Sequence, residues 1–239
     1  MRVVGLTGSG GTGKTTLSVN IASCLALSEV RTLAIDADLY FPDMFSHVRI
    51  PSPRFLHDYL EDPEMDLEWL IQQYPGIRDL YFILGELKVK EISVGDFSLV
   101  SGLVEILKEY YGVVMVDFPS GAPIEAFPLL SSLDLQILVI DPRRTPLLDL
   151  ETSIVNTIYK YWKGEPKKLA LVFNFADLPE KRLERLEDYL SSELGIPILG
   201  KVPYSHALLT EPYEGAPACL EGEAQDIERI TYDLLEYYL

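Results

Sequence analysis

A glycine-rich stretch near the N-terminus constrains this chain more than any other feature. Residues 8–16 read Gly-Ser-Gly-Gly-Thr-Gly-Lys-Thr-Thr and lie between a short apolar run and a segment of helical character. The spacing matches G-x-x-x-x-G-K-[ST], a phosphate-binding loop that joins a strand to a helix. Its glycines let the backbone turn tightly and point N–H groups at a phosphate chain. The stretch therefore predicts a site for a nucleoside triphosphate.

Two side chains after the glycines fit the chemistry of such a site. Lys14 carries a point charge that can meet the β- and γ-phosphates, and the hydroxyl of Thr15 is the type of ligand that Mg²⁺ takes in these loops. The helix that begins here adds the positive end of its dipole. The alternative is a glycine-rich turn that only caps a helix. The specified positions and both flanking elements favour the phosphate loop.

Apolar runs rich in branched residues alternate with segments of helical period along the chain. This alternation is typical of a parallel sheet with helices on both faces. Strands are expected at 3–6, 32–35, 80–84, 113–116, 135–140, 168–173 and 198–202, and helices at 14–27, 55–60, 97–111, 146–162, 179–194 and 224–239. Residues 41–75, with their scattered prolines, should otherwise be loop. We expect one α/β domain over residues 1–239, a doubly wound, mostly parallel sheet of the P-loop NTPase type.

Charge and cysteine content limit the partners and the compartment. The chain has 20 Lys and Arg against 37 Asp and Glu, a formal charge of −17, whereas nucleic acids and anionic membranes attract a surplus of positive charge. The polar face of residues 224–239 is acidic, so we expect neither nucleic-acid binding nor a direct membrane anchor. Cys24 and Cys219 form no C-x-x-C pair, which indicates neither a disulfide framework nor a self-contained metal site. With no signal peptide before Gly8 and no membrane-length apolar run, we expect a cytoplasmic protein.

Three carboxylates stand where strands should end, the edge at which parallel α/β sheets bind ligands. Asp36 and Asp38 follow the second apolar run, and Asp117 follows the run at 113–116. Carboxylates can hold Mg²⁺ or orient an attacking water, although at such positions they often cap turns and helices instead. Their order after a phosphate loop favours the nucleotide site. The N–H of Gly121 is a further candidate, for contact with a γ-phosphate.

Together these motifs resemble the MinD/ParA/Mrp group of deviant Walker A ATPases. The motifs that carry the resemblance are Gly10-Gly11-Thr12-Gly13-Lys14-Thr15-Thr16, Asp36-Ala37-Asp38, Val116-Asp117-Phe118-Pro119-Ser120-Gly121, Asn174 and Val202-Pro203-Tyr204. The resemblance spans nearly the whole chain. It implies an ATPase that acts as a nucleotide-controlled switch for a protein partner, with ATP or ADP and Mg²⁺ as ligands and an ATP-dependent homodimer as its active form.

The resemblance also implies a role for each matching residue. Lys14 and Asp38 would be catalytic, Asp38 by orienting the water. The phosphate ligands would be Gly10, Gly11, Thr12, Gly13, Lys14, Thr15, Thr16 and Gly121. Mg²⁺ would be held by Thr15, Asp36 and Asp117. Asn174, Pro203 and Tyr204 would frame the adenine. The outline of a guanine motif at Asn174-Phe175-Ala176-Asp177 lacks its lysine, and the family pattern favours adenine.

One position departs from the family. The residue before Gly10 is usually a lysine that reaches the nucleotide of the partner subunit, and here it is Ser9. A hydroxymethyl group has neither the length nor the charge for that reach. Slow hydrolysis, another cation supplied in trans, and a protein that works mainly as a nucleotide-bound switch all agree with Ser9. Arg143 and Arg144 follow a strand end and are candidate substitutes, although exposed charge is the simpler explanation.

Two other functions stay open at this point. The turn at Asp36-Ala37-Asp38 and the nearby Pro42 resemble Mrp-like proteins, which predicts an accessory ATPase for metal-centre assembly. A small-molecule kinase or ligase would use the same phosphate loop with a substrate pocket from residues 41–75, where Arg49, Arg54 and His57 are the polar candidates.

Overall fold

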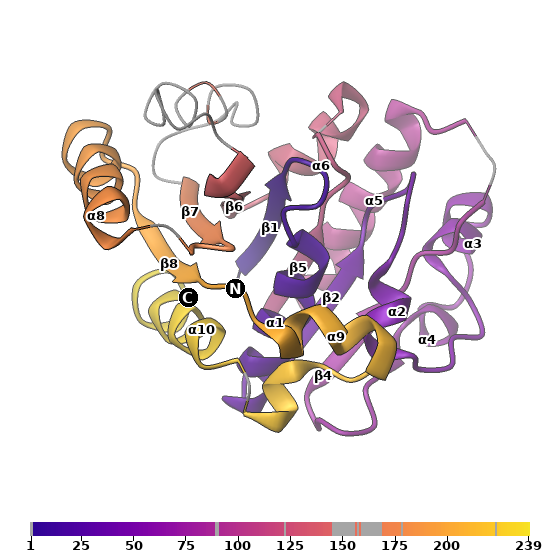
Figure 1. Ribbon diagram of the computed structural model, residues 1–239. Coiled ribbons are helices and arrows are strands. Elements are labelled where there is room, and N and C mark those ends of the chain that lie inside the picture. The colour runs from indigo at the N-terminus through magenta and orange to yellow at the C-terminus, as the bar shows by residue number, and fades with distance from the viewer. Residues whose placement is uncertain are drawn as a thin grey trace.

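An eight-stranded sheet forms the centre of the molecule (Figure 1). The computed structural model describes residues 2–88, 91–121, 123–144, 169–177, 179–222 and 224–239, together with residues 156 and 158. Its strand order is β3-β4-β2-β5-β1-β6-β7-β8, and only β3 runs antiparallel to its neighbour. The strands are β1 Arg2–Gly8, β2 Thr32–Asp36, β3 Gln72–Gln73, β4 Leu80–Ile83, β5 Val113–Asp117, β6 Leu135–Ile140, β7 Leu169–Asn174 and β8 Ile198–Val202. The expected doubly wound, mostly parallel α/β fold is confirmed.

Alternate residues of the strands supply buried clusters on the two faces of the sheet, one cluster on the first face and two on the second. Val4 and Leu6 of β1 pack with α1 (Lys14–Leu27) and α10 (Gln225–Tyr237), whereas Val3 faces the other side. That second face is covered by α3 (Leu56–Glu61), α5 (Val94–Leu107) and α6 (Phe127–Ser131), and further along the sheet by α8 (Glu180–Asp188). Because both faces are covered, the strands read as nearly continuous apolar runs.

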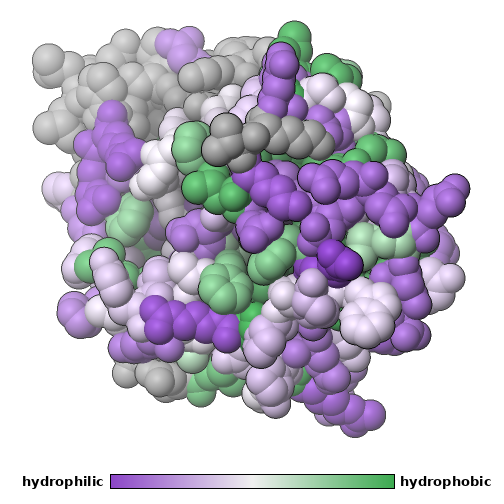
Figure 2. All heavy atoms as spheres, turned by 90° about the vertical axis from the view of Figure 1, so that its right-hand side faces the viewer, coloured by the Kyte–Doolittle hydropathy of each residue, from purple (hydrophilic) through white to green (hydrophobic). Residues whose placement is uncertain are grey.

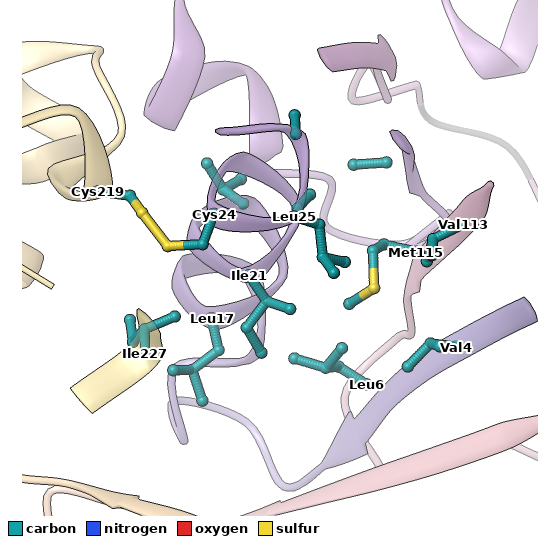
Figure 3. Packing of buried hydrophobic residues seen from close by; sticks show 14 of the residues in the cluster. Val4, Leu6, Leu17, Ile21, Cys24, Leu25, Val113, Met115, Cys219 and Ile227 are labelled. Atoms are coloured by element: carbon teal, nitrogen blue, oxygen red, sulfur yellow. A yellow bond between two sulfur atoms is a disulfide. The ribbon is translucent and has the colours of Figure 1, made fainter. Parts of the chain in front are cut away.

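Helix α1 connects the phosphate-loop stretch to the core (Figure 3). Ile21 and Leu25 point toward Leu6 of β1 and Met115 of β5, Leu17 lies beside Ile227 of α10, and all three helix residues are fully buried. Cys24 points away from the sheet, toward Cys219. The bounds of α1 agree with the predicted 14–27 because a glycine at its start and a strong apolar run define it locally.

Several helices begin or end differently from the prediction. Helix α5 starts at Val94, before the expected residue 97, because Ser93 accepts a hydrogen bond from the N–H of Asp96 while the Asp96 carboxylate accepts one from the N–H of Ser93. This capping box fixes the N-terminus of the helix. The expected helix 179–194 divides into α8 and a π-helical turn, Tyr189–Glu193. The expected helix 146–162 lies outside the described residues, apart from the helical residues 156 and 158.

Short elements were missed where no periodicity has room to develop. Residues 41–75 hold α2 (Met44–Val48), α4 (Leu67–Leu70) and β3 besides the expected short helix, which is α3. Helices α6 and α9 (His206–Glu214) were also missed, and α9 contains Pro212. Among the helices of the described ranges, none combines the length and apolar character needed to cross a bilayer.

The two cysteines form a disulfide, which corrects the sequence-based interpretation. Cys24 of α1 bonds Cys219 in the short helix η5 (Ala218–Glu221), with 6.2 Å between the Cα atoms and a sequence separation of 195. Sequence spacing carries no sign of this pair because the fold alone brings η5 onto α1. The cysteines therefore no longer support the expectation of a reducing compartment.

Candidate functional site

The glycine-rich loop lies at the carboxyl end of β1, between the ends of its neighbours β5 and β6. Gly8 pairs with Val139 of β6, and Leu6 pairs with Asp117 of β5. Gly13 has φ +84°, and a Cβ atom there would come within 2.2 Å of the side-chain nitrogen of Asn174. Both the dihedral angle and the space therefore require glycine at this position.

Lys14 is held against the loop in the structure. The side chain is nearly buried, and Nζ donates to the carbonyl oxygen of Ser9 at 3.2 Å and to Oγ of Ser120 at 3.1 Å. The hydroxyl of Thr12 donates to the same Ser9 carbonyl at 3.0 Å. The charge of Lys14 is thus held in place beside the backbone turn that would receive phosphates.

Thr15 and Asp117 meet directly. The Thr15 hydroxyl donates to Oδ2 of Asp117 at 2.6 Å, and the hydroxyl of Ser18, one turn further along α1, donates to Oδ1 at 3.2 Å. Burial raises the pKa of Asp117 to about 6, although the Thr15 hydroxyl and the charge of Lys14 oppose that rise. The hydroxyl and carboxylate predicted to hold a metal ion are therefore neighbours.

Asp36 is the cross-strand neighbour of Asp117, since the two residues pair in register between β2 and β5. Asp36 is fully buried, and burial together with the charge of Asp117 raises its pKa well above the ordinary value. The backbone N–H groups of Met44 and Asp38 donate to its two oxygens at 3.0 and 3.3 Å. Two carboxylates in this position repel each other and would be stabilised by a bound cation.

The oxygen donors fit Mg²⁺ when a nucleotide is present. Mg²⁺ usually binds one or two carboxylates together with phosphates and water, and Thr15, Asp36 and Asp117 supply a hydroxyl and two carboxylates. In the described part of the chain, no group of three or more His, Cys, Asp or Glu side chains could hold a metal ion. Phosphate oxygens would therefore have to complete the coordination.

Asp38 and Gly121 lie in turns beside the loop. Oδ1 of Asp38 accepts hydrogen bonds from the N–H groups of Tyr40 and Phe41, at 3.2 and 2.9 Å. Gly121, at φ +88°, donates its N–H to the carbonyl oxygen of Gly8 at 3.1 Å. A contact between this N–H and a phosphate would have to replace that bond.

An open pocket lies next to the loop, between the ends of β7 and β8 and helix α9. It is lined by Gly13, Thr16, Leu17, Asp43, His47, Asn174, Phe175, Pro203, Ser205, Leu208, Leu209 and Pro212. Asn174 donates its amide to the carbonyl oxygen of Thr12 at 2.8 Å, which joins the pocket to the phosphate loop. Pro203 lies in the wall, whereas Tyr204 is about half exposed and donates its N–H to Asp177 at 2.9 Å.

Sequence reasoning missed a buried polar network behind this pocket. Glu211 is fully buried and accepts hydrogen bonds from the amide of Asn20 and the N–H of Ala218, and His47 lies 2.6 Å from its other oxygen. The N–H of Cys219 donates to Asn20 at 3.0 Å. These residues come from α1, α2, α9 and η5, so no local pattern identifies them.

A further polar group follows β6 next to the loop, and sequence reasoning missed one of its members, Asp141. Asp141, whose side chain is buried, follows β6 and binds both Arg143 and Arg144. Its place after an apolar run is the signal that had identified Asp36 and Asp117. The three residues named for a kinase pocket lie apart from this group: Arg49 donates to the carbonyl of Pro212, Arg54 is exposed and His57 is buried in α3.

The chain matches one known protein family over most of its length. A family model described as CobQ/CobB/MinD/ParA nucleotide binding domain matches residues 3–218. A putative septum site-determining protein MinD of Emiliania huxleyi is 26% identical over 232 residues, which cover 93% of this chain and 81% of that protein. An iron-sulfur cluster carrier protein of Pyrococcus furiosus is 25% identical over 246 residues, 93% of this chain and 80% of the carrier.

Solved structures share the fold. MinD of Pyrococcus horikoshii, complexed with Mg-ADP, superposes with a TM-score of 0.77 and 21% identity, covering 98% of this chain and 96% of the other. A MinC:MinD cell division complex of Aquifex aeolicus contains a chain with a TM-score of 0.75 and 19% identity, covering 100% of this chain and 98% of that one.

Proposed function

We propose, from the premise that the chain belongs to the CobQ/CobB/MinD/ParA nucleotide-binding domain family, that it is a Mg²⁺-dependent ATPase acting as a nucleotide-controlled switch. The observation that carries the proposal is the position of Thr15 against Asp117 at 2.6 Å, beside the buried Asp36. This arrangement gives Mg²⁺ its oxygen ligands next to the loop that would hold the phosphates. Bound Mg²⁺ would neutralise charge on the phosphates.

Different residues of the chain would have different roles in hydrolysis. Lys14 and the loop N–H groups of residues 10–16 would bind the β- and γ-phosphates. Thr15, Asp36 and Asp117 would hold the Mg²⁺, and Asp38 would orient the attacking water. Because Lys14 is already held next to the turn by Ser9 and Ser120, binding requires little rearrangement of this side chain.

Adenine would enter the pocket walled by Asn174, Pro203 and helix α9, with Tyr204 at its rim. Asn174 and Asp177 correspond to the polar positions of a guanine-reading motif. Here Asn174 binds the Thr12 carbonyl and Asp177 binds the N–H of Tyr204. Because the side chains of Asn174 and Asp177 already bind the backbone of the protein, they are not placed to read guanine, which supports adenine as the base.

A change of the bound nucleotide would alter the turns that hold Asp38 and Gly121 and thereby the surface that a protein partner contacts. Phe41 and Ile124, each three residues beyond one of these positions, are 76% and 82% exposed. Apolar side chains at that exposure suit contact with another protein. The face that carries α2, α3 and α4 is mostly hydrophilic with scattered apolar side chains (Figure 2). With its charge of −17, the chain should select a protein partner over nucleic acid.

Nucleotide binding and turnover test the proposal. Lys14→Ala should abolish binding of a fluorescent ATP analogue, and Asp38→Asn should retain binding but lose turnover. Lys108→Ala, which removes a partly exposed lysine that pairs with Glu105 on the far side of the sheet, is the matched control. Wild-type affinity in Lys14→Ala would disprove the nucleotide site. Sedimentation with a non-hydrolysable ATP analogue tests whether the protein also forms the ATP-dependent homodimer.

The relationship to an iron-sulfur cluster carrier supports a second candidate, an accessory ATPase for metal-centre assembly. The described residues hold no metal cluster of their own, so this role would require a separate metal-binding partner. Capture with the ATP-bound Asp38→Asn variant separates the two candidates, because only the second predicts a metalloprotein or metallochaperone in the complex.

A further inference from the structure

The turn after β6 places a guanidinium group on the phosphate loop. Nη1 of Arg144 donates to the carbonyl oxygen of Gly10. A Cβ atom on Gly11 would come within 2.9 Å of Nη2 of the same side chain. Gly11, at φ +69°, therefore requires glycine both for its backbone conformation and for the room that Arg144 takes.

The buried carboxylate of Asp141 holds the turn after β6 but balances only one of its two arginine charges. Asp141 binds Arg143 through two hydrogen bonds of 3.0 Å from Nε and Nη2, and Nε of Arg144 lies 3.3 Å from one of its oxygens. One carboxylate thus faces two guanidinium groups, so the three side chains have a formal excess of one positive charge.

The two arginines have different surroundings. The Arg143 guanidinium lies over the ring of Phe175 at 4.1 Å, against the wall of the base pocket. Arg144 extends to the phosphate loop instead, and its side chain is 57% exposed. Arg144 is therefore the member of the pair that can reach a bound triphosphate.

The charge of the site makes such a cation necessary. Asp36 and Asp117 pair in register beside the loop, Asp38 lies in the turn that follows β2, and a bound triphosphate adds further negative charge. The position at which the family resemblance implies a lysine holds Ser9. An arginine that stabilises the transition state of phosphoryl transfer contributes roughly 10³–10⁵-fold to turnover and can be supplied in cis.

We propose that Arg144 supplies in cis the cation that Ser9 does not, by binding the γ-phosphate of ATP in the same subunit. The inference rests on the proposed ATPase function. In hydrolysis, the water oxygen bonds the γ-phosphorus while the bond to the bridging oxygen breaks. That oxygen leaves on ADP, and both water protons remain on the inorganic phosphate. Arg144 stabilises the negative charge of the γ-phosphoryl group during this exchange.

Nucleotide affinity gives a readout that does not depend on turnover. Because the contact is with the γ-phosphate, Arg144→Ala should weaken ATP binding about tenfold, the effect of one charge-assisted hydrogen bond, and change ADP binding less than about twofold. Turnover should fall by roughly 10²–10³-fold. Arg144→Lys, which keeps the charge, should lie between wild type and Arg144→Ala. Arg229→Ala, an exposed arginine on α10, controls for the loss of one positive charge.

A mixing experiment separates cis from trans. Arg144→Ala has an intact loop but lacks the arginine, whereas Lys14→Ala has the arginine but lacks the loop lysine. If Arg144 acts in cis, the mixture stays as slow as Arg144→Ala alone. Recovery of activity in the mixture would overturn the inference. It would also be overturned if Arg144→Ala bound ATP with the same affinity as the wild type.

Failure of the proposed function gives a different result. A wild type that binds no nucleotide would remove the ATPase proposal and this inference together. A wild type that binds and hydrolyses ATP at the same rate as Arg144→Ala would overturn the role of Arg144 alone.

Discussion

The hydroxyl of Thr15 donates to Oδ2 of Asp117 at 2.6 Å, so the two groups assigned to Mg²⁺ are bonded to each other across the junction of α1 and β5. Thr15→Ala removes a metal ligand and the partner of that carboxylate. We expect the affinity for Mg·ATP to fall by about 10–100-fold, as is typical for loss of a ligand-supporting contact. Titrations of a fluorescent ATP analogue in the presence of Mg²⁺ and in the presence of EDTA measure the effect. Only the affinity measured with Mg²⁺ should differ between the variant and the wild type. Thr15→Ser keeps the hydroxyl and should bind nearly as the wild type does.

The buried carboxylates predict an unusual pH dependence of stability. Folding raises the pKa of Asp117 from 3.8 to about 6, so the folded chain binds more protons than the unfolded chain between these values. The contribution of Asp117 to the free energy of unfolding therefore falls as the pH rises through that window, by about 3 kcal/mol in all. Asp36 acts in the same direction.

Asp117→Asn should reduce that slope, because the amide does not titrate. Urea unfolding of the nucleotide-free protein at pH 5 and pH 7.5 measures the effect. The free energy of unfolding of the variant, relative to that of the wild type, should be higher at pH 7.5 than at pH 5. An identical pH slope in wild type and variant would show that Asp117 does not titrate in this window. In a parallel unfolding experiment with Mg·ATP added, the ligand should stabilise the wild type but not Asp117→Asn, since the variant lacks a metal ligand.

Gly13 offers a sharp test of the loop. Gly13→Ala would strain a residue at φ +84° and push its methyl group into the amide of Asn174. We expect a loss of about 1–3 kcal/mol in the free energy of unfolding, together with loss of nucleotide binding. Gly102→Ala is the matched control, since Gly102 is an exposed glycine inside α5 with open space around its Cα. That change should stabilise the protein by about 0.5–1 kcal/mol without altering binding.

The sequence predicts those features of the fold and of the site that depend on residues close together in the chain. The apolar runs predict seven of the strands, because all of them except the edge strand β8 are largely buried on both faces, but not the two polar residues of β3. Glycine spacing places the phosphate loop, and the strand ends place Asp36 and Asp117, because parallel strands bring their carboxyl ends to one edge.

Contacts between distant segments leave no such local trace. Arg143 and Arg144 look like exposed charge in the sequence, yet the buried Asp141 directs one to Phe175 and the other to Gly10. The pairing of Glu211 with His47 likewise needs α2 and α9 to be placed first. Register and packing decide these contacts, and they appear only in the folded chain.

The disulfide is the clearest long-range contact and supports the last prediction. Cys24 and Cys219 join α1 to η5, and the loop they close is 195 residues long. Cross-links that close long loops stabilise mainly by restricting the unfolded chain, typically by about 2–4 kcal/mol. Reduction should therefore lower the midpoint of thermal unfolding by roughly 5–15 °C for a chain of this size.

The doubly substituted Cys24→Ala, Cys219→Ala protein distinguishes the disulfide from other effects of a reductant. It should unfold near the temperature of the reduced wild type and show no change when a reductant is added. Because the Cys219 N–H binds Asn20, which in turn binds Glu211, loss of the cross-link should also loosen the wall of the base pocket. Faster amide hydrogen exchange in α9 than in α5 would report this loosening. Equal melting of oxidised and reduced wild type would show that packing alone holds η5 on α1.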